Sequence, residues 1–327
     1  MSAKAFASID PAAYVPHELH RAERSWNESN CYIDVWIELL HALKLDPAAC
    51  LPFTLAVDFE GDQWTFFKPP HEDLIELYGI DVQELNVWRP LIQVAREHVA
   101  NGKVVLTEAD AFFLPDTAGT DYRTQHTKTT IAIQEIDEAS RTLRYFHNGG
   151  YYGLSGADFV GLFRIDTPPD PAYMPFFAEF VRLARIERKP ENALAQTSRE
   201  LLRKHLARRP DTNPVARFEE RFTADVTWLK TAGLATYHGY AFATLRQLGA
   251  SFELAAYYLR WLQARGEADL TPIAAEFDQI SSTAKALILK TARAVNGNKS
   301  VDFAPQMAVM KESWARGMDG LASRFGR

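Results

Sequence analysis

The spacing of apolar residues changes once along the chain, near residue 172, and this change limits the possible folds more than any other feature. Before it, helix-spaced and strand-like segments are mixed; after it, strand patterns fade and helix-spaced patterns run almost to residue 327. A proline-rich connector, TPPDP at 167–171, lies at the change. We therefore predict an α+β domain at residues 1–168 and an all-helical domain at residues 169–327.

The first domain is predicted to contain an antiparallel sheet. Alternating and β-branched runs indicate strands at 53–59, 103–113, 126–136 and 142–146, and helix-spaced apolar residues indicate helices at 31–43, 71–79 and 90–101. The last two strands flank the turn-like sequence DEAS and should form a hairpin. The polar loop at 114–125 is long for a compact domain, and such loops are often functional.

The second domain is predicted to consist of successive helices without an internal repeat. Helical patterns cover residues 172–188, 191–208, 214–229, 233–248, 251–265, 272–295 and 303–324. Breaks are expected at Pro190, Pro210, Gly249, Gly266 and Gly297.

The net charge of −6 is divided unequally along the chain. Residues 1–166 carry 13 basic and 25 acidic side chains, whereas residues 167–327 carry 23 basic and 17 acidic ones. Nine basic side chains accompany three acidic ones within residues 182–209. This stretch is either a solvated helical face or a docking surface for an acidic partner, to which Arg199, Arg203 and Arg208 would contribute. The absence of a protein-wide basic character argues against nucleic-acid binding.

Cysteine content and hydropathy bear on the cellular location of the protein. Cys31 and Cys50 can form neither a disulfide framework nor a zinc cluster by themselves. No apolar run reaches 18 residues, and the N-terminal sequence lacks the apolar region of a signal peptide. We therefore expect a cytoplasmic location and no membrane partner.

Cys31 is the leading candidate for a catalytic nucleophile. It is expected in the first turn of a helix, where the positive end of the helix dipole favours the thiolate. A nucleophilic cysteine also requires a histidine to take its proton and a polar group to orient that histidine. The alternative is a buried, unreactive cysteine, which is the description that fits Cys50 in AACLPF.

Two further segments offer the remaining members of a triad. His126 is expected at the start of a strand, and His147 and Asn148 at the end of the next one. If these strands form a hairpin, the three residues lie near the same open end. Cysteine at a helix start, histidine at a strand start and asparagine at the next strand's end suit a Cys–His–Asn triad. Taken alone, His126 would be a surface or capping histidine.

Three motifs carry a resemblance to a known fold. A cysteine at the head of a helix, VVLxxxDAFFLP at 104–115 and YxxxH at 122–126 resemble the papain-like fold over residues 25–165. They are similar to the N-terminal domain of the butirosin-pathway acyltransferase family and to bacteriocin-processing C39-like peptidases. The whole chain, including DFEGDQWTFFK and FHNGGYY, resembles a bacterial family linked to stand-alone amino acid:carrier-protein ligases.

The resemblance implies that an acyl or aminoacyl group passes from a carrier-protein thioester to Cys31. It implies His126 as the base and Asn148 as the residue that orients it. The relatives have an aspartate where this chain has His147-Asn148, so the choice between these two stays open.

The oxyanion of such a reaction needs hydrogen-bond donors. The backbone N–H of Cys31 is the natural one, since it begins a helix. The side-chain amide of Asn27 or Asn30 is either a second donor or simply a helix N-cap, and Ser29 is a further N-cap candidate.

Other polar residues are candidates for binding substrate. Gln63 and Trp64 would line the cleft or belong to a turn, and Asp110 and Asp116 would bind a cationic amine. No spacing of the type His-x-x-x-His accompanies these acids, so no metal site is predicted.

The leading hypothesis is a cysteine-dependent acyl- or aminoacyltransferase that passes an acyl group from a carrier protein to a small acceptor. It requires no cofactor except phosphopantetheine, the arm of the carrier-protein partner. A papain-like hydrolase (a peptidase, amidase or thioesterase) would use the same triad with water as the acceptor. A non-catalytic carrier-protein-binding protein would instead contain an unreactive Cys31.

Overall fold

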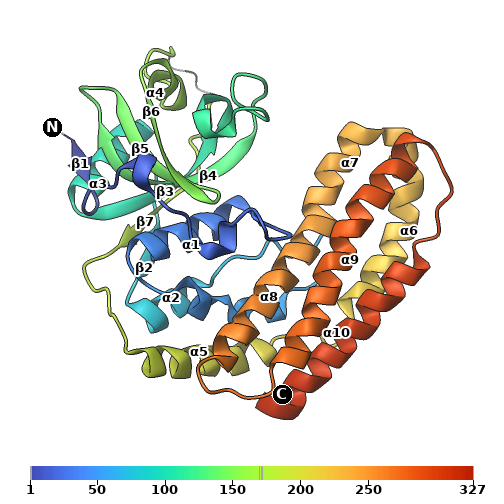
Figure 1. Ribbon diagram of the computed structural model, residues 1–327. Coiled ribbons are helices and arrows are strands. Elements are labelled where there is room, and N and C mark those ends of the chain that lie inside the picture. Colours follow the sequence, from blue (N-terminus) through green and yellow to red (C-terminus); the bar gives the residue numbers. More distant parts are fainter. Residues whose placement is uncertain (1, 169, 171, 327) are drawn as a thin grey trace. The chain divides into compact units, whose positions relative to one another are not determined.

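The computed structural model describes residues 2–168, 170 and 172–326. Its elements form two compact units (Figure 1). The sheet unit comprises residues 1–22, 30–46 and 74–188, and the helical unit comprises residues 23–29, 47–73 and 189–327. The α+β character is confirmed, with a sheet in the N-terminal half and helices in the C-terminal half. The two units interleave along the chain, in contrast to the consecutive domains predicted at 1–168 and 169–327.

The sheet unit is built on an antiparallel sheet in the order β2-β7-β3-β4-β5-β6, with β1 paired to β4 beyond the end of β3. The strands are β1 (Ala3–Lys4), β2 (Asp81–Glu84), β3 (Lys103–Asp110), β4 (Lys128–Asp137), β5 (Thr142–His147), β6 (Gly150–Ser155) and β7 (Ala178–Arg182). The predicted hairpin of β4 and β5 is confirmed, with Ile133 opposite Tyr145.

The two faces of β4 contact different helices, because successive side chains of a strand point to opposite faces. Ile131 and Ile133 share a core with residues of α3 (Leu91–Ala100) and α4 (Ala157–Leu162). Thr130 points to the other face, where it contacts the first residue of α1 (Cys31–Ala42). Helix α2 (His71–Tyr78) contributes its first three residues to the helical unit and the rest to the sheet unit.

The predicted helix at 172–188 is wrong, because Ala178–Arg182 form β7, which lies between β2 and β3 in the sheet. Val181 pairs with Val82 on one side and with Val104 on the other. The short sequence AEFVR satisfies a helical pattern as well as a strand pattern, and pairing with two strands distant in sequence decides between them. The two outermost strands of this order, β2 and β6, were not predicted either.

The helical unit consists of helices joined by short loops. They are α5 (Glu191–Leu206), α6 (Pro214–Ala232), α7 (Leu234–Ala241), α8 (Gln247–Gln263), α9 (Thr271–Asn296) and α10 (Ala304–Phe325). A π-helical turn, Phe242–Arg246, connects α7 to α8, and the carbonyl of Ala243 in this turn accepts the backbone N–H of Trp64 at 3.1 Å. Within the described part of the chain, every helix is too short or too polar to cross a lipid bilayer.

Two predictions fail in the helical unit. The predicted strand at 53–59 lies largely in a buried 3₁₀ helix, Pro47–Ala56, where Pro52 has no N–H to give to a strand ladder. The predicted break at Gly249 is also wrong, since α8 continues through it. A Cβ atom at Gly249 would lie 2.3 Å from Cζ2 of Trp26, so glycine is needed there for close packing.

Replacing Gly249 with alanine should destabilise the helical unit. Trp26 cannot easily yield, because its Nε1 donates a hydrogen bond to Ser281 Oγ at 2.9 Å. We expect Gly249→Ala to lower the free energy of unfolding by about 1–3 kcal/mol, measured by urea denaturation with far-UV circular dichroism. Gly239→Ala in α7 is the control: nothing lies within 4 Å of its Cβ position, and it should be neutral or stabilise by up to about 1 kcal/mol. Equal effects of the two variants would contradict the packing explanation.

Candidate functional site

Cys31 begins α1, as predicted, and Asn30 is the N-cap of that helix. The side-chain oxygen of Asn30 accepts the backbone N–H groups of Tyr32 and Ile33 at 3.2 and 3.1 Å. The Cys31 thiol is partly exposed, and its Sγ lies 3.6 Å from Thr130 Oγ1. Among the described residues, no acceptor bonds to the backbone N–H of Cys31, so this donor remains available at the helix N-terminus.

A row of polar side chains extends from Cys31 along one face of β3 and β4. Glu108 lies directly opposite Thr130, and Asp110 lies directly opposite Lys128. Residues opposite each other, or two apart on one strand, share a face of the sheet. Lys128 Nζ is 2.6 Å from Glu108 Oε1. We call Thr130, Glu108, Lys128 and Asp110 the polar ladder.

His126 continues this row beyond the polar ladder. Its Nδ1 is 2.6 Å from Asp110 Oδ2, and its ring stacks on Phe112 with centroids 4.4 Å apart. His126 is four residues from Thr130, which corresponds to about 13 Å along a strand. Its side chain is 68% exposed.

The structure therefore does not bring His126 into hydrogen-bond contact with Cys31. The thiol bonds to Thr130, and His126 bonds to Asp110. The residue that orients His126 in the structure is Asp110, which corrects the expectation that His147 or Asn148 has this role. Asn148 lies in the turn between β5 and β6 with a φ of 44°.

His147 belongs to a separate, buried network on the other face of the sheet. It pairs with Ile131 across β4 and β5, so its side chain points away from the face that carries Thr130. Its Nδ1 is 2.5 Å from Asp116 Oδ2, and its Nε2 is 2.8 Å from Thr129 Oγ1. Asp116 also accepts a hydrogen bond from the Tyr145 hydroxyl. Asp116 is thus occupied within the protein, in contrast to its predicted role in binding substrate.

Three further candidates lie in the helical unit. Trp64 is buried against Phe59 and Phe218, so it has almost no surface to offer a substrate. The carbonyl of Gln63 accepts the N–H of Glu60 at 2.8 Å, which confirms the turn alternative for this segment. Asn27 is exposed in the segment 23–29.

The basic stretch 182–209 is shared between the two units, because the division falls after Arg188. In the helical unit, Arg199 forms an ion pair with Glu267 at 3.0 Å. Arg203 and Arg208 are exposed and form no ion pair with any described residue. These two arginines are therefore free to meet an acidic partner.

Sequence comparison assigns both parts of the chain. The profile of the DUF1839 N-terminal domain matches residues 15–183, and that of the DUF1839 C-terminal domain matches residues 191–323. The chain belongs to the DUF1839 family. The first match ends one residue after β7, whose last residue is Arg182, so the DUF1839 N-terminal domain includes the strand that the predicted boundary at 168 left out. No functionally curated protein matches the chain.

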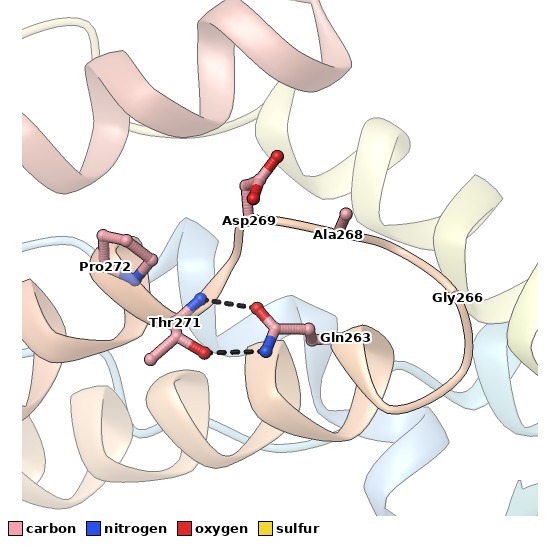
Figure 2. Close-up of a pocket in the computed structure, with 6 residues that line it drawn as sticks. All are labelled: Gln263, Gly266, Ala268, Asp269, Thr271 and Pro272. Carbon is pink, nitrogen blue, oxygen red and sulfur yellow. Dashed lines mark hydrogen bonds between the residues drawn. The ribbon is translucent and has the colours of Figure 1, made fainter.

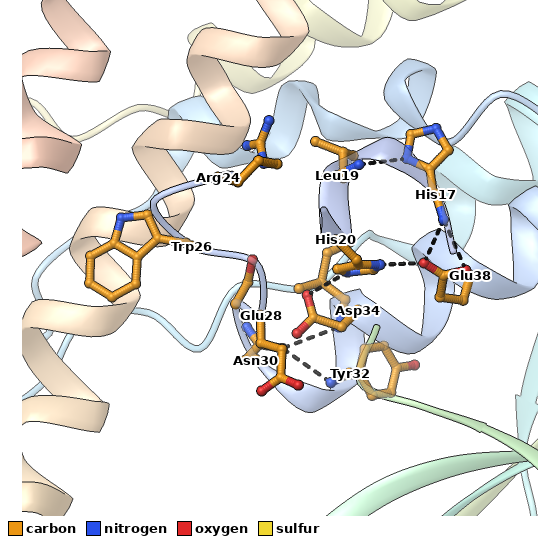
Figure 3. A network of polar contacts seen from close by, with 12 residues as sticks. His17, Leu19, His20, Arg24, Trp26, Glu28, Asn30, Tyr32, Asp34 and Glu38 are labelled. Atoms are coloured by element: carbon orange, nitrogen blue, oxygen red, sulfur yellow. Dashed lines mark hydrogen bonds and ion pairs between the residues drawn. The ribbon is translucent and has the colours of Figure 1, made fainter. Parts of the chain in front are cut away.

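The DUF1839 N-terminal domain also contains a buried polar cluster on α1 that was not predicted (Figure 3). Asp34 and Glu38 are one helical turn apart and fully buried. His20 lies between them, with Nε2 3.3 Å from Asp34 Oδ1 and Nδ1 bonded to Glu38 Oε1. Glu38 also accepts the Tyr14 hydroxyl and, at 3.0 Å, the backbone N–H of His17. Two carboxyl groups within an otherwise apolar helix were the signal in the sequence, since buried acids require such partners.

The cluster shifts the ionisation of its own members. Burial alone lowers the pKa of His20, but hydrogen bonds and attraction to Asp34 and Glu38 outweigh it and raise that pKa to about 9. Burial favours the neutral form of Glu38, yet the bonds from His20 and Tyr14 hold its pKa below the usual range. Burial and the neighbouring His41 lower the pKa of His17 to about 4. At neutral pH, His20 is therefore charged and His17 is neutral.

Other surface features offer less chemistry. A pocket of about 460 Å³ lies at the loop between α8 and α9 (Figure 2). There Gln263 already bonds to the backbone and the hydroxyl of Thr271, which closes the loop. Among the described residues, no group of three or more His, Cys, Asp or Glu side chains has the geometry to hold a metal ion.

The buried cluster predicts how stability depends on pH. The folded pKa of His20 is raised from 6.5 to about 9, so its contribution is complete below pH 6.5 and is lost as the pH rises through 9. We expect the free energy of unfolding to fall by up to about 3 kcal/mol over this interval. Urea denaturation at several pH values measures it.

Two variants test whether His20 causes this loss. His20→Gln keeps hydrogen-bonding groups beside both carboxylates but cannot titrate, so stability should become nearly independent of pH in the same interval. His17→Gln should retain the dependence of the native protein, because His17 is already neutral there. An unchanged slope in His20→Gln would refute the assignment.

Proposed function

We propose that the DUF1839 N-terminal domain is papain-like and that Cys31 accepts an acyl or aminoacyl group from a carrier-protein thioester and passes it to a small acceptor. The single observation that carries the proposal is the position of Cys31. Its partly exposed thiol and its unbonded backbone N–H lie together at the N-terminus of α1. A nucleophile and an oxyanion donor are thereby supplied by one residue.

The proposed reaction has two steps, the formation of an acyl-enzyme and its reaction with an amine. The Cys31 sulfur attacks the thioester carbonyl, a new carbon–sulfur bond forms, and the bond to the phosphopantetheine sulfur breaks. That sulfur leaves with the proton that Cys31 gives up. An amine then attacks the acyl-enzyme, forms an amide and returns a proton to Cys31. In both steps the oxyanion accepts the Cys31 N–H at the positive end of the helix dipole.

Acid–base catalysis falls to the His126–Asp110 pair on the same face. His126 is exposed, and Asp110 already holds its Nδ1, so Nε2 is free to exchange protons with a substrate that lies along the polar ladder. A thioester needs less activation than a peptide bond, so the pair serves mainly to deprotonate the incoming amine. With water in place of the amine, the same residues would make the protein a hydrolase.

A second candidate function is non-catalytic carrier-protein binding. It is favoured by the hydroxyl of Thr130, which is the hydrogen-bond partner of the thiol and cannot act as a base near neutral pH. In that case Cys31 would react slowly with any thioester.

Acyl transfer to Cys31 can be detected by intact-mass spectrometry. After mixing with a glycyl-loaded carrier protein, or with S-acetyl-N-acetylcysteamine, the protein should gain one acyl group. Cys31→Ala should gain none, whereas Cys50→Ala, which removes a buried thiol, should react like the native protein. His126→Gln should slow release to an added amine by roughly 100-fold or more. Unreactive Cys31 in a folded protein would favour the non-catalytic alternative.

Carrier docking can be tested separately from chemistry. Arg203→Glu with Arg208→Glu should weaken binding of the acidic carrier protein by about tenfold or more, with the larger effect at low salt. The rate at which iodoacetamide labels Cys31 should not change. The control is Arg293→Glu with Lys299→Glu, which makes the same charge change at two other exposed positions of the helical unit. This double variant should bind the carrier protein more tightly than the first one. Equal loss in both double variants would show only a general charge effect.

A further inference from the structure

A cavity in the sheet unit has the properties of a ligand site. Its lining residues have no role in the proposed acyl transfer. Its volume is about 540 Å³, within the range of small-molecule pockets. The segment before α3, the end of α4 and the residues after α4 form its wall. Its apolar lining includes Trp88, Pro90, Leu91, Leu162, Phe163 and Ile165.

Large apolar side chains remain exposed around this cavity. Trp88 is 77% exposed, and Ile165 and Tyr173 are each 38% exposed. Leaving a tryptophan and two further large side chains in water around one concave site is unfavourable unless a ligand covers them. Trp88 and Tyr173 are also flat, so they suit a planar molecule.

Two arginines line the same cavity, and one of them has no anionic partner among the described residues. Arg164 has no carboxylate within ion-pair distance among the described residues, and its guanidinium lies 4.2 Å from the centre of the Tyr173 ring. Arg89, in contrast, is ion-paired with Glu97. Arg164 is therefore the arginine of this lining that lacks an anionic partner among the described residues.

The acidic residues of the lining do not neutralise these arginines. Glu138 forms an ion pair at 2.8 Å with Arg96, a residue that does not line the cavity. Asp170 is exposed, and its Oδ1 accepts the backbone N–H of Ala172. The cavity thus combines an apolar, aromatic wall with the guanidinium of Arg164, which has no anionic partner among the described residues.

We infer that this cavity binds a small aromatic molecule that carries one anionic group. The aromatic body would cover Trp88 and Ile165, and the anion would accept hydrogen bonds from the guanidinium of Arg164. Arginine is suited to both tasks, since its planar guanidinium bonds to carboxylates and stacks on rings. The inference does not depend on the reactivity of Cys31.

Binding of 2-naphthoate and of its uncharged analogue 2-naphthamide to the full chain tests this site by isothermal titration calorimetry. We expect saturable binding of 2-naphthoate with one site per chain, and weaker binding of the amide. Arg164→Gln should weaken 2-naphthoate by about tenfold and leave the amide unchanged, because only the charged hydrogen bond is lost. Trp88→Ala should weaken both ligands.

Two variants elsewhere serve as controls. Trp228→Ala removes another exposed tryptophan, 54% exposed in the helical unit, and should leave both ligands bound as before. Arg293→Gln removes an exposed arginine of α9 and should also have no effect. The inference is wrong if 2-naphthoate shows no saturable binding at millimolar concentration. It is also wrong if Arg164→Gln weakens both ligands equally, or if Trp228→Ala has the effect of Trp88→Ala.

Discussion

The burial of Asp34 and Glu38 on one helix is the constraint on which the sheet unit depends. Two carboxyl groups inside a core are tolerated only when other groups bond to them. His20, Tyr14 and the backbone of His17 supply those bonds, so the segment 14–20 is held against α1. With this segment in place, α1 packs on β4 and β5, and its first residue contacts Thr130. The position of the candidate nucleophile thus follows from a buried ionic cluster that begins one turn farther along the same helix.

The alternation of side chains along β4 separates two sets of polar groups that look equivalent in the sequence. Thr130 and Lys128 share a face with Cys31, and the pairing of β3 adds Glu108 and Asp110 to that face. Thr129 points the other way and bonds to His147, which Asp116 holds in the interior. A buried Thr–His–Asp arrangement and an exposed Asp–His pair therefore occur on opposite faces of one sheet. Only the exposed pair shares a face with the thiol.

The contact between Thr130 and the thiol limits the chemistry of the proposed acyl transfer. A threonine there cannot take a proton from the cysteine, and His126 lies two ladder positions farther along. Cleavage of an unactivated amide depends on a base beside the nucleophile, whereas exchange between a thiol and a thioester does not. The proposed thioester substrate therefore suits a site that offers the backbone N–H of Cys31 to an oxyanion but has no base beside the thiol. The aromatic cavity with Arg89 and Arg164 is a separate feature of the same unit, with its own charge and shape.

Local sequence determined much of the protein by itself. The helix that begins at Cys31, its cap Asn30, the hairpin of β4 and β5, and most helices of the second half follow from periodicity and capping, which act over a few residues. Tertiary structure decided the rest, because it depends on pairing between distant segments. The strand Ala178–Arg182 depends on its two neighbours in the sheet, and the close approach of Trp26 explains why a glycine stands inside α8 at position 249. Likewise, the packing of α1 on β4 placed Thr130 beside the thiol, and the register of β3 against β4 placed Asp110 within reach of His126. No residue spacing within one segment specifies how two segments pair or pack.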